Sequence, residues 1–247
     1  MQTTVTSDRK NCIDYIKNVL NLEKHCLPHI SREKEKEGRY FLSLTYDENV
    51  KETFLYRLKD LVAEVICLTY KYDFFIENLK LKMDNNELKL AFTKCLSIYD
   101  IEADKDYIFS LDLIDKVVCV DGIFNFMLKS LTDRWREVVK LTNLNFHSFK
   151  SKESQILFIK YLLNTQHSKV KDVVLNYQNG KLVILDTNNK DLNFYSLVLD
   201  EKVSALFSLI WIHPEKIMVS PSAECSSVFS VVRTLFPEKL SLVHYKR

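Results

Sequence analysis

The sequence predicts an α+β protein in which a mainly helical region, residues 1–168, is followed by a small α+β domain, residues 169–247. Three observations predict this class. Apolar residues recur every three or four positions through most of the first region, as on the buried face of a helix. After Lys169 the pattern changes to the alternation of strands, interrupted at Asn179-Gly180. Only 3 glycines and 4 prolines occur in 247 residues, which leaves few tight turns for a sandwich or barrel.

The first elements are predicted from spacing and from end signals. Residues 8–26 place isoleucine, valine and leucine on one helical face, and Ser7 or Asp8 can cap the start. Residues 32–39 alternate in charge and are interpreted as a solvated helix end or connector rather than a binding tail. A short strand rich in aromatic residues is expected near 40–46.

The remainder of the first region is predicted to be helical. A long helix follows Asp47, and Asn85-Asn86 marks a break before the next one. Gly122 follows Asp121, and backbone geometry or close packing is expected to select this glycine. Residues 124–139 form a helix or a broken pair of helices, and residues 151–166 form a helix capped by Ser151.

The C-terminal domain is predicted to have the element order β-β-α-β-α-β. Its strongest signal is Asn179-Gly180 between two alternating runs, because a type I′ hairpin turn requires a positive φ at both central residues. Beyond this hairpin we expect a helix over 200–212, a strand over 216–219, a helix over 222–235 and a strand over 240–245.

Composition excludes several function classes. The 35 Lys+Arg against 33 Asp+Glu give a net charge of +2, which by itself does not indicate nucleic-acid binding. The glycines are too few and too scattered for a dinucleotide fingerprint or a P-loop, so no cofactor is predicted. The longest apolar stretch, Val203–Ile212, is shorter than a membrane span. A polar start and scattered cysteines predict a cytoplasmic protein with reduced thiols.

The reactive side chains do not assemble into a recognisable catalytic or metal motif. Cys26 and His29 have ligand-like spacing but lack the paired knuckles of a zinc site, and whether they bind metal stays open. His213 is interpreted as a polar helix end, and Asp121 and Asp186 as cap or turn residues. The segment from Lys129 to Lys140, with Trp135, is the densest basic and aromatic stretch. Its interleaved acids favour ion pairs within a helix over contacts with phosphates.

Three segments resemble the YtxC-like family of sporulation proteins of spore-forming Firmicutes, over roughly residues 45–237. They are Val120–Lys129, Glu153–Gln166 and Val203–Ile217. Met127 stands where the family usually has arginine, and the chain ends without the short cysteine cluster that many members carry. The motif positions, interpreted as structural, are Asp121, Gly122, Phe126, Lys129, Glu153, Gln166, Asp186, Ser204 and Pro214.

The resemblance implies a sporulation-associated cytoplasmic protein and no reaction. Together with the lack of a catalytic motif, it leads to the hypothesis of a non-enzymatic protein that binds an as yet unknown protein partner. Two alternatives stay open. The first is nucleic-acid binding through the segment 129–140 and a β-rich domain, and the second is an enzyme with an inter-domain site. The oligomeric state is not predicted.

Overall fold

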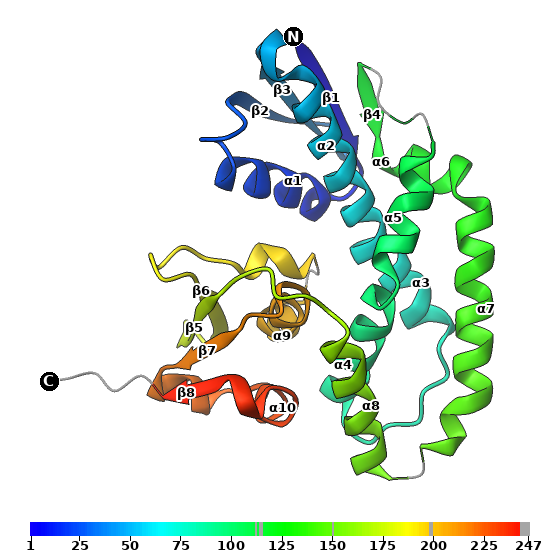
Figure 1. Ribbon diagram of the computed structural model, residues 1–247, viewed down its shortest axis with the longest axis vertical. Coiled ribbons are helices and arrows are strands. Elements are labelled where there is room, and N and C mark those ends of the chain that lie inside the picture. Colours follow the sequence, from blue (N-terminus) through cyan, green and yellow to red (C-terminus); the bar gives the residue numbers. More distant parts are fainter. Residues whose placement is uncertain (112, 114–115, 150, 198–199, 243–247) are drawn as a thin grey trace, which may run out of the picture. The chain divides into compact units, whose positions relative to one another are not determined.

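The computed structural model describes residues 1–111, 113, 116–149, 151–197 and 200–242. It is a mixed α+β protein with two small mixed sheets, which confirms the predicted class (Figure 1). The chain forms two compact units. The first unit comprises residues 1–75 and 100–139, and the second comprises 76–99 and 140–247. These units differ from the predicted domains, because residues 76–99 and 140–168 group with the C-terminal residues.

The first unit contains a sheet that the sequence analysis largely missed. Its strands are β1 Gln2–Ser7, β2 His29–Lys36, β3 Arg39–Tyr46 and β4 Val117–Cys119, in the order β2-β3-β1-β4. Only β3 was predicted. β4 lies parallel to β1, although more than a hundred residues separate them in the chain. Such a pairing leaves no local turn signal in the sequence.

The prediction of a helix end or connector over 32–39 is wrong, because most of it belongs to β2. β2 and β3 form an antiparallel hairpin that turns at Glu37-Gly38, both at positive φ. The run Arg-Glu-Lys-Glu-Lys alternates with a period of two, which is the period of a strand. In a strand this alternation sends the cations to one face and the carboxylates to the other.

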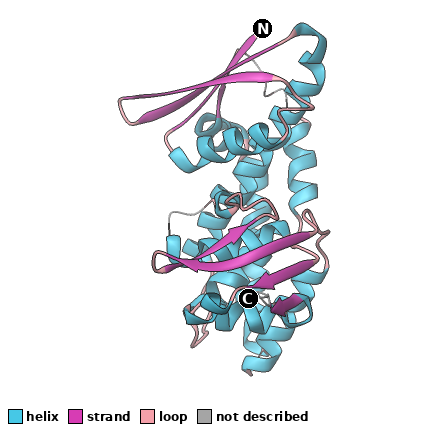
Figure 2. Cartoon of the chain, turned by 90° about the vertical axis from the view of Figure 1, so that its left-hand side faces the viewer, coloured by secondary structure: helices cyan, strands magenta, loops and turns pink. Residues whose placement is uncertain are grey.

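Helices α1 (Lys10–Leu22) and α2 (Lys51–Val65) cover one face of this sheet (Figure 2). Val5, Leu42 and Leu44 are fully buried on that face. Tyr46 stacks on Phe54 of α2 with ring centroids 4.3 Å apart. Burial of these side chains fixes the register of the sheet, because a slip of one residue would expose them.

The rest of the first unit is helical. α2 continues through a π-helical turn, η2 (Ile66–Tyr70), into α3 (Lys71–Asn78), as the predicted long helix requires. α5 (Ile101–Phe109) follows, and β4 leads into the short α6 (Val120–Gly122) and a second π-helical turn, η3 (Ile123–Met127). α7 (Lys129–Asn145) begins after a break at Leu128, which is the broken pair that was predicted.

The second unit contains the predicted hairpin and its parallel continuation. β5 (Asp172–Gln178) and β6 (Lys181–Leu185) are joined by Asn179 and Gly180, whose φ values of 52° and 81° confirm the type I′ prediction. β7 (Lys216–Val219) and β8 (Leu240–Leu242) extend the sheet in parallel, in the order β6-β5-β7-β8. Residues 243–245 of the predicted last strand lie outside the described residues.

Four helices accompany this second sheet: α4 (Asn86–Ile98), α8 (Lys152–Asn164), α9 (Glu201–Ile212) and α10 (Phe229–Leu235). Asn85 caps α4 and Ser151 caps α8 through a capping box, as the break and cap signals predicted. α9 is almost entirely buried. Short 3-10 turns connect the elements at 48–50, 146–148, 193–196, 221–225 and 237–239. None of the helices in the described residues is long and apolar enough to span a membrane.

Candidate functional site

The face of the first sheet that α1 and α2 leave uncovered is the most distinctive surface of the first unit. The strand register defines it, since residues paired directly opposite each other point to the same side. We call it the open face. Its residues are Gln2, Thr4, Thr6, Ile30, Arg32, Lys34, Lys36, Arg39, Phe41, Ser43, Thr45, Val117 and Cys119.

Cations gather on the open face, and none of its described residues is acidic. Arg32, Lys34 and Lys36, which we call the cation row, are all exposed on β2. Neither Arg32 nor Lys34 has an ion-pair partner among the described residues, and Lys36 has only a 3.8 Å contact with Glu37. The row is spaced every second residue, or about 6.6–6.8 Å, along a straight strand.

The carboxylates of the same hairpin lie on the opposite face. Glu33 is opposite the buried Leu42 and pairs with Lys17 of α1 at 2.8 Å. Lys36, in contrast, lies directly opposite Arg39, a cross-strand pair of like charges. Such a pair is destabilising in a sheet, so stability does not explain the arrangement.

The centre of the open face carries hydroxyl groups and one aromatic ring. Phe41, in the register position between Lys34 and Thr6, is half-buried. Thr6 is 3% exposed, and its Oγ1 has no hydrogen-bond partner among the described residues. Arg39 donates from Nη1 to Cys119 Sγ across 3.5 Å, a weak bond for a guanidinium.

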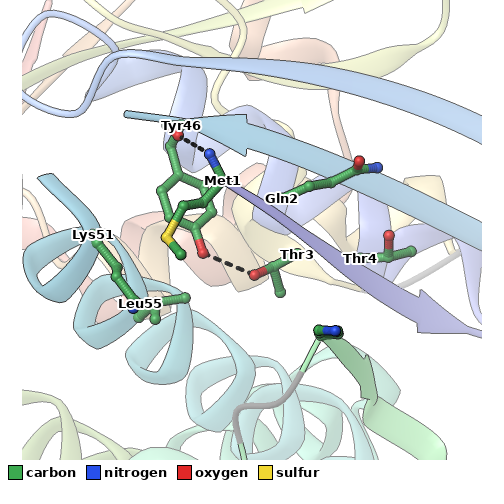
Figure 3. A pocket seen from close by; sticks show the side chains of 8 residues that line it. Met1, Gln2, Thr3, Thr4, Tyr46, Lys51 and Leu55 are labelled. Atoms are coloured by element: carbon green, nitrogen blue, oxygen red, sulfur yellow. Dashed lines mark hydrogen bonds between the residues drawn. The ribbon is translucent and has the colours of Figure 1, made fainter. Parts of the chain in front are cut away.

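A hollow of about 610 Å³ opens beside the amino end of β1 (Figure 3). Figure 3 shows Gln2 and Thr4 of the open face on one side and Lys51 and Leu55 of α2 on the other. Tyr46 closes it from within, with its hydroxyl 2.9 Å from Thr3 Oγ1. The hollow adds two lining lysines, Lys51 and Lys116, at the border of the open face.

Asp121 lies at the carboxyl ends of the parallel strands β1 and β4, beside both π-helical turns. Its carboxylate accepts hydrogen bonds from the backbone N–H of Asp8 at 3.0 Å, from Ser7 Oγ at 3.3 Å and from the Tyr70 hydroxyl. Burial alone would raise the pKa of Asp121, but the hydrogen bonds from Asp8 and Tyr70 hold it below its usual value. The pKa of Asp8 is raised by its hydrogen bond with Asp121 and by burial. The carboxylate thus joins the strand ends to η2, beyond the predicted cap or turn role.

A second buried network surrounds Asp104, which is fully buried. Lys71, also fully buried, approaches its Oδ2 at 2.7 Å, and Trp135 Nε1 donates to the same oxygen at 3.0 Å. Arg134 lies 3.7 Å from Oδ1. Trp135 is 0% exposed. The ring therefore cannot stack on a base, which removes the aromatic part of the nucleic-acid interpretation of segment 129–140.

One of the ion pairs predicted within segment 129–140 is present among the described residues. Arg136 pairs with Asp133 three residues earlier within α7, as the intrahelical interpretation requires. Lys129 is exposed at the start of α7.

Two motif positions near these groups, Gly122 and Phe126, have distinct environments. Gly122 is helical, and a Cβ there would meet Cys119 Sγ at 3.2 Å, so close packing rather than backbone conformation accounts for the glycine. Phe126 is 87% exposed in η3. A ring exposed to this extent packs little core, and the structural role of this position stays a prediction.

The remaining motif positions of α8 and its end lie in the second unit. Glu153 is exposed in the first turn of α8, where backbone hydrogen bonding and Ser151 lower its pKa. Gln166 follows α8, and its Nε2 is buried without a hydrogen-bond partner among the described residues. Neither position forms part of a described cluster of reactive groups.

Asp186, Ser204 and Pro214 have structural contacts. Asp186 Oδ1 accepts from the backbone of Asn188 and Lys190 at 2.8 Å each, which confirms a turn role. Ser204 Oγ donates to the Asn193 carbonyl at 3.3 Å. The Pro214 carbonyl accepts from Lys239 Nζ at 2.8 Å.

His213 ends α9 in the left-handed region, at φ 43°, and is the predicted polar helix end. Its Nε2 lies 2.9 Å from Lys239 Nζ. Burial and the Lys239 charge lower the pKa of His213 to about 4, with the backbone of Gln166 opposing them. The imidazole is therefore neutral at physiological pH.

Cys26 and His29 do not share a site in the described residues. Cys26 is exposed, whereas His29 is buried, with its Nδ1 2.8 Å from the Leu27 carbonyl. Within the part of the chain that the structure describes, no three or more His, Cys, Asp or Glu side chains lie together in a way that could hold a metal ion.

In comparisons with known proteins, no family model, no curated protein and no solved structure matches this chain. The YtxC-like resemblance stays a prediction. The open face was not predicted, although the two-residue charge period of 32–37 is a sequence signal for it.

Proposed function

We propose that this chain is a non-catalytic binding protein and that its open face binds a partner presenting an array of phosphate groups. The observation that carries the proposal is the segregation of charge across the β2–β3 hairpin. The cation row and Arg39 share one face, and Glu33 and Glu35 lie on the other.

A net charge near neutrality does not oppose this proposal, because binding depends on local charge. The chain carries +2 overall, yet the described residues of the open face carry four cations and no carboxylate. Cations brought against phosphates release counterions, so affinity falls steeply with added salt. Nucleic acid, inorganic polyphosphate and an anionic membrane surface all present this chemistry.

The test compares two variants of equal charge. In the first, Arg32→Gln, Lys34→Gln and Lys36→Gln neutralise the cation row. In the control, three exposed lysines outside both the open face and segment 129–140 are neutralised by Lys152→Gln, Lys190→Gln and Lys202→Gln. Each protein is titrated at several salt concentrations with single-stranded oligonucleotide, long-chain polyphosphate and vesicles containing phosphatidylserine.

We expect the first variant to lose binding and the control to retain it. If wild type binds none of the three probes, or if both variants lose binding equally, the proposal is wrong. The probe that binds identifies the source of the phosphate groups.

A protein partner is a second candidate, and the exposed ring of Phe126 favours it. Phe126 is 87% exposed and is followed by Met127, which is 42% exposed, so η3 presents two adjacent apolar side chains. We propose, on the resemblance alone, that such contacts serve sporulation in the cytoplasm of a Firmicute. A photocrosslinking residue at 126 should capture the same protein repeatedly from sporulating cells, and a Phe126→Ser protein should fail to recover it. Absence of a reproducible crosslink would exclude this candidate.

A further inference from the structure

We infer that the partner of the open face is single-stranded nucleic acid, with the cation row along its phosphates and Phe41 stacked on a base. This inference rests on the proposed function and names the partner of the same surface. It is drawn from the distribution of side-chain types across the four strands.

The face has cations toward one side and base-compatible groups at its centre. The outer strand β2 carries the cation row, whereas the inner strands β1 and β3 carry the Phe41 ring and, farther along the same face, the hydroxyl groups of Thr4, Ser43 and Thr45. Single strands are bound by this combination, because a row of cations follows the backbone while an aromatic side chain stacks on an unpaired base. Hydroxyl groups on the same face can bond to base edges or to sugars.

The dimensions favour a single strand over a duplex. Four strands about 4.8 Å apart make a face roughly 14 Å wide, before side chains are added. The major groove of B-DNA is about 12 Å wide and admits a helix or a two-stranded ribbon, so the whole face cannot enter it. In a duplex the base faces are stacked inside, and Phe41 would have no base to contact.

Arg39 adds a cation whose guanidinium makes only a weak hydrogen bond among the described residues, although the charge of Asp8 is close enough to interact with it. Its Nη1 bonds to the weak acceptor Cys119 Sγ at 3.5 Å, and the nearby Thr6 Oγ1 is buried without a partner among the described residues. A phosphate would offer the guanidinium two charged oxygens in place of one sulfur. We therefore assign Arg39 to a phosphate at the end of the cation row.

The experiment uses the full chain and fluorescence anisotropy. The probes are a labelled 12-nucleotide single strand of thymidine, a single strand of mixed sequence, and a blunt duplex of the same length, with long-chain polyphosphate as an unlabelled competitor. The variants are Phe41→Leu, Phe41→Tyr, and the cation-row triple variant with its three-lysine control. Circular dichroism and urea midpoints establish that each variant is folded.

We expect the single strands to bind at least tenfold more tightly than the duplex. Phe41→Leu should weaken single-strand binding by roughly 5- to 150-fold, as loss of a stacked base requires, and Phe41→Tyr should retain it. Neutralising the cation row should reduce the slope of log affinity against log salt by about 2, since each single-strand phosphate contact contributes about 0.7.

The two proposals fail in different ways. If the duplex or polyphosphate binds as tightly as the single strand, or if folded Phe41→Leu binds like wild type, single-strand recognition is overturned while phosphate binding by the open face stands. If no phosphate polymer or anionic vesicle binds, or if the cation-row variant matches its control, both are overturned. If Phe41→Leu is unfolded, Phe41→Tyr and the duplex comparison still decide the inference.

Discussion

Replacing Lys71 by methionine should destabilise the first unit more than any surface substitution. Lys71 and Asp104 are both 0% exposed, and Lys71 Nζ lies 2.7 Å from Asp104 Oδ2. Burial would lower the pKa of Lys71, but the carboxylates of Asp104 and Asp100 raise it above its usual value, so Lys71 carries a buried charge. Methionine keeps the apolar stem and removes only the charge.

The magnitude follows from what remains around Asp104. Its carboxylate keeps the Trp135 N–H at 3.0 Å and Arg134 at 3.7 Å, but it loses its closest counter-ion. Removing one partner of a buried ion pair costs about 3–5 kcal/mol. With a urea dependence of about 2 kcal/mol per M, the midpoint should fall by roughly 1.5–2.5 M.

Trp135 allows this loss to be measured in the first unit. The chain has 2 tryptophans, one in each unit, so a Trp211→Phe background leaves Trp135 as the fluorescent reporter. Lys71→Met is compared in that background with Lys10→Met, an exposed lysine that should change stability by less than about 0.5 kcal/mol. Adding Asp104→Asn to Lys71→Met removes the orphaned charge and keeps an acceptor for Trp135, so it should recover much of the loss. A Lys71→Met loss below about 1 kcal/mol, or no recovery in the double variant, would refute the reasoning.

Three further predictions concern other parts of the chain. The pKa of His213 is about 4 in the folded protein, against an ordinary value of 6.5. Between these two pH values the unfolded chain binds more protons than the folded chain. The free energy of unfolding should therefore fall as the pH falls from 6.5 to 4. The loss should be roughly 2 kcal/mol by urea unfolding, and a His213→Asn protein that shows the same pH dependence would contradict it. Gly180→Ala should cost about 1 kcal/mol, because Gly180 has φ 81°, and an unchanged melting temperature would count against the turn assignment. Three cysteines are buried: Cys12, Cys67 and Cys95. In native buffer a thiol reagent should label only the exposed or half-exposed cysteines, since burial shields the other thiols and raises the pKa of Cys12 to about 12. Mass spectrometry should find the three buried cysteines modified only after unfolding. Rapid labelling of any of the three in folded protein would contradict that burial.

Local signals in the sequence determined the elements that depend on neighbouring residues. Asn179-Gly180 specified its hairpin because the turn needs two positive φ values, and the two residues supply them. Ser151 specified the start of α8 because its side chain caps a backbone N–H three residues away. Both interactions are complete within a few residues, so they can be predicted without the remainder of the fold.

Only the tertiary structure decided which face a residue occupies and what lies opposite. The charge alternation of 32–37 has the period of a strand, but only its pairing with β3 decides which face the cations share and what lies beside them. Trp135 belongs to a basic segment in sequence, yet Asp104, from another helix, draws its N–H into the core. The pairing of β1 with β4 joins residues more than a hundred positions apart. Such contacts arise from burial shared between distant segments, which no short window of sequence encodes.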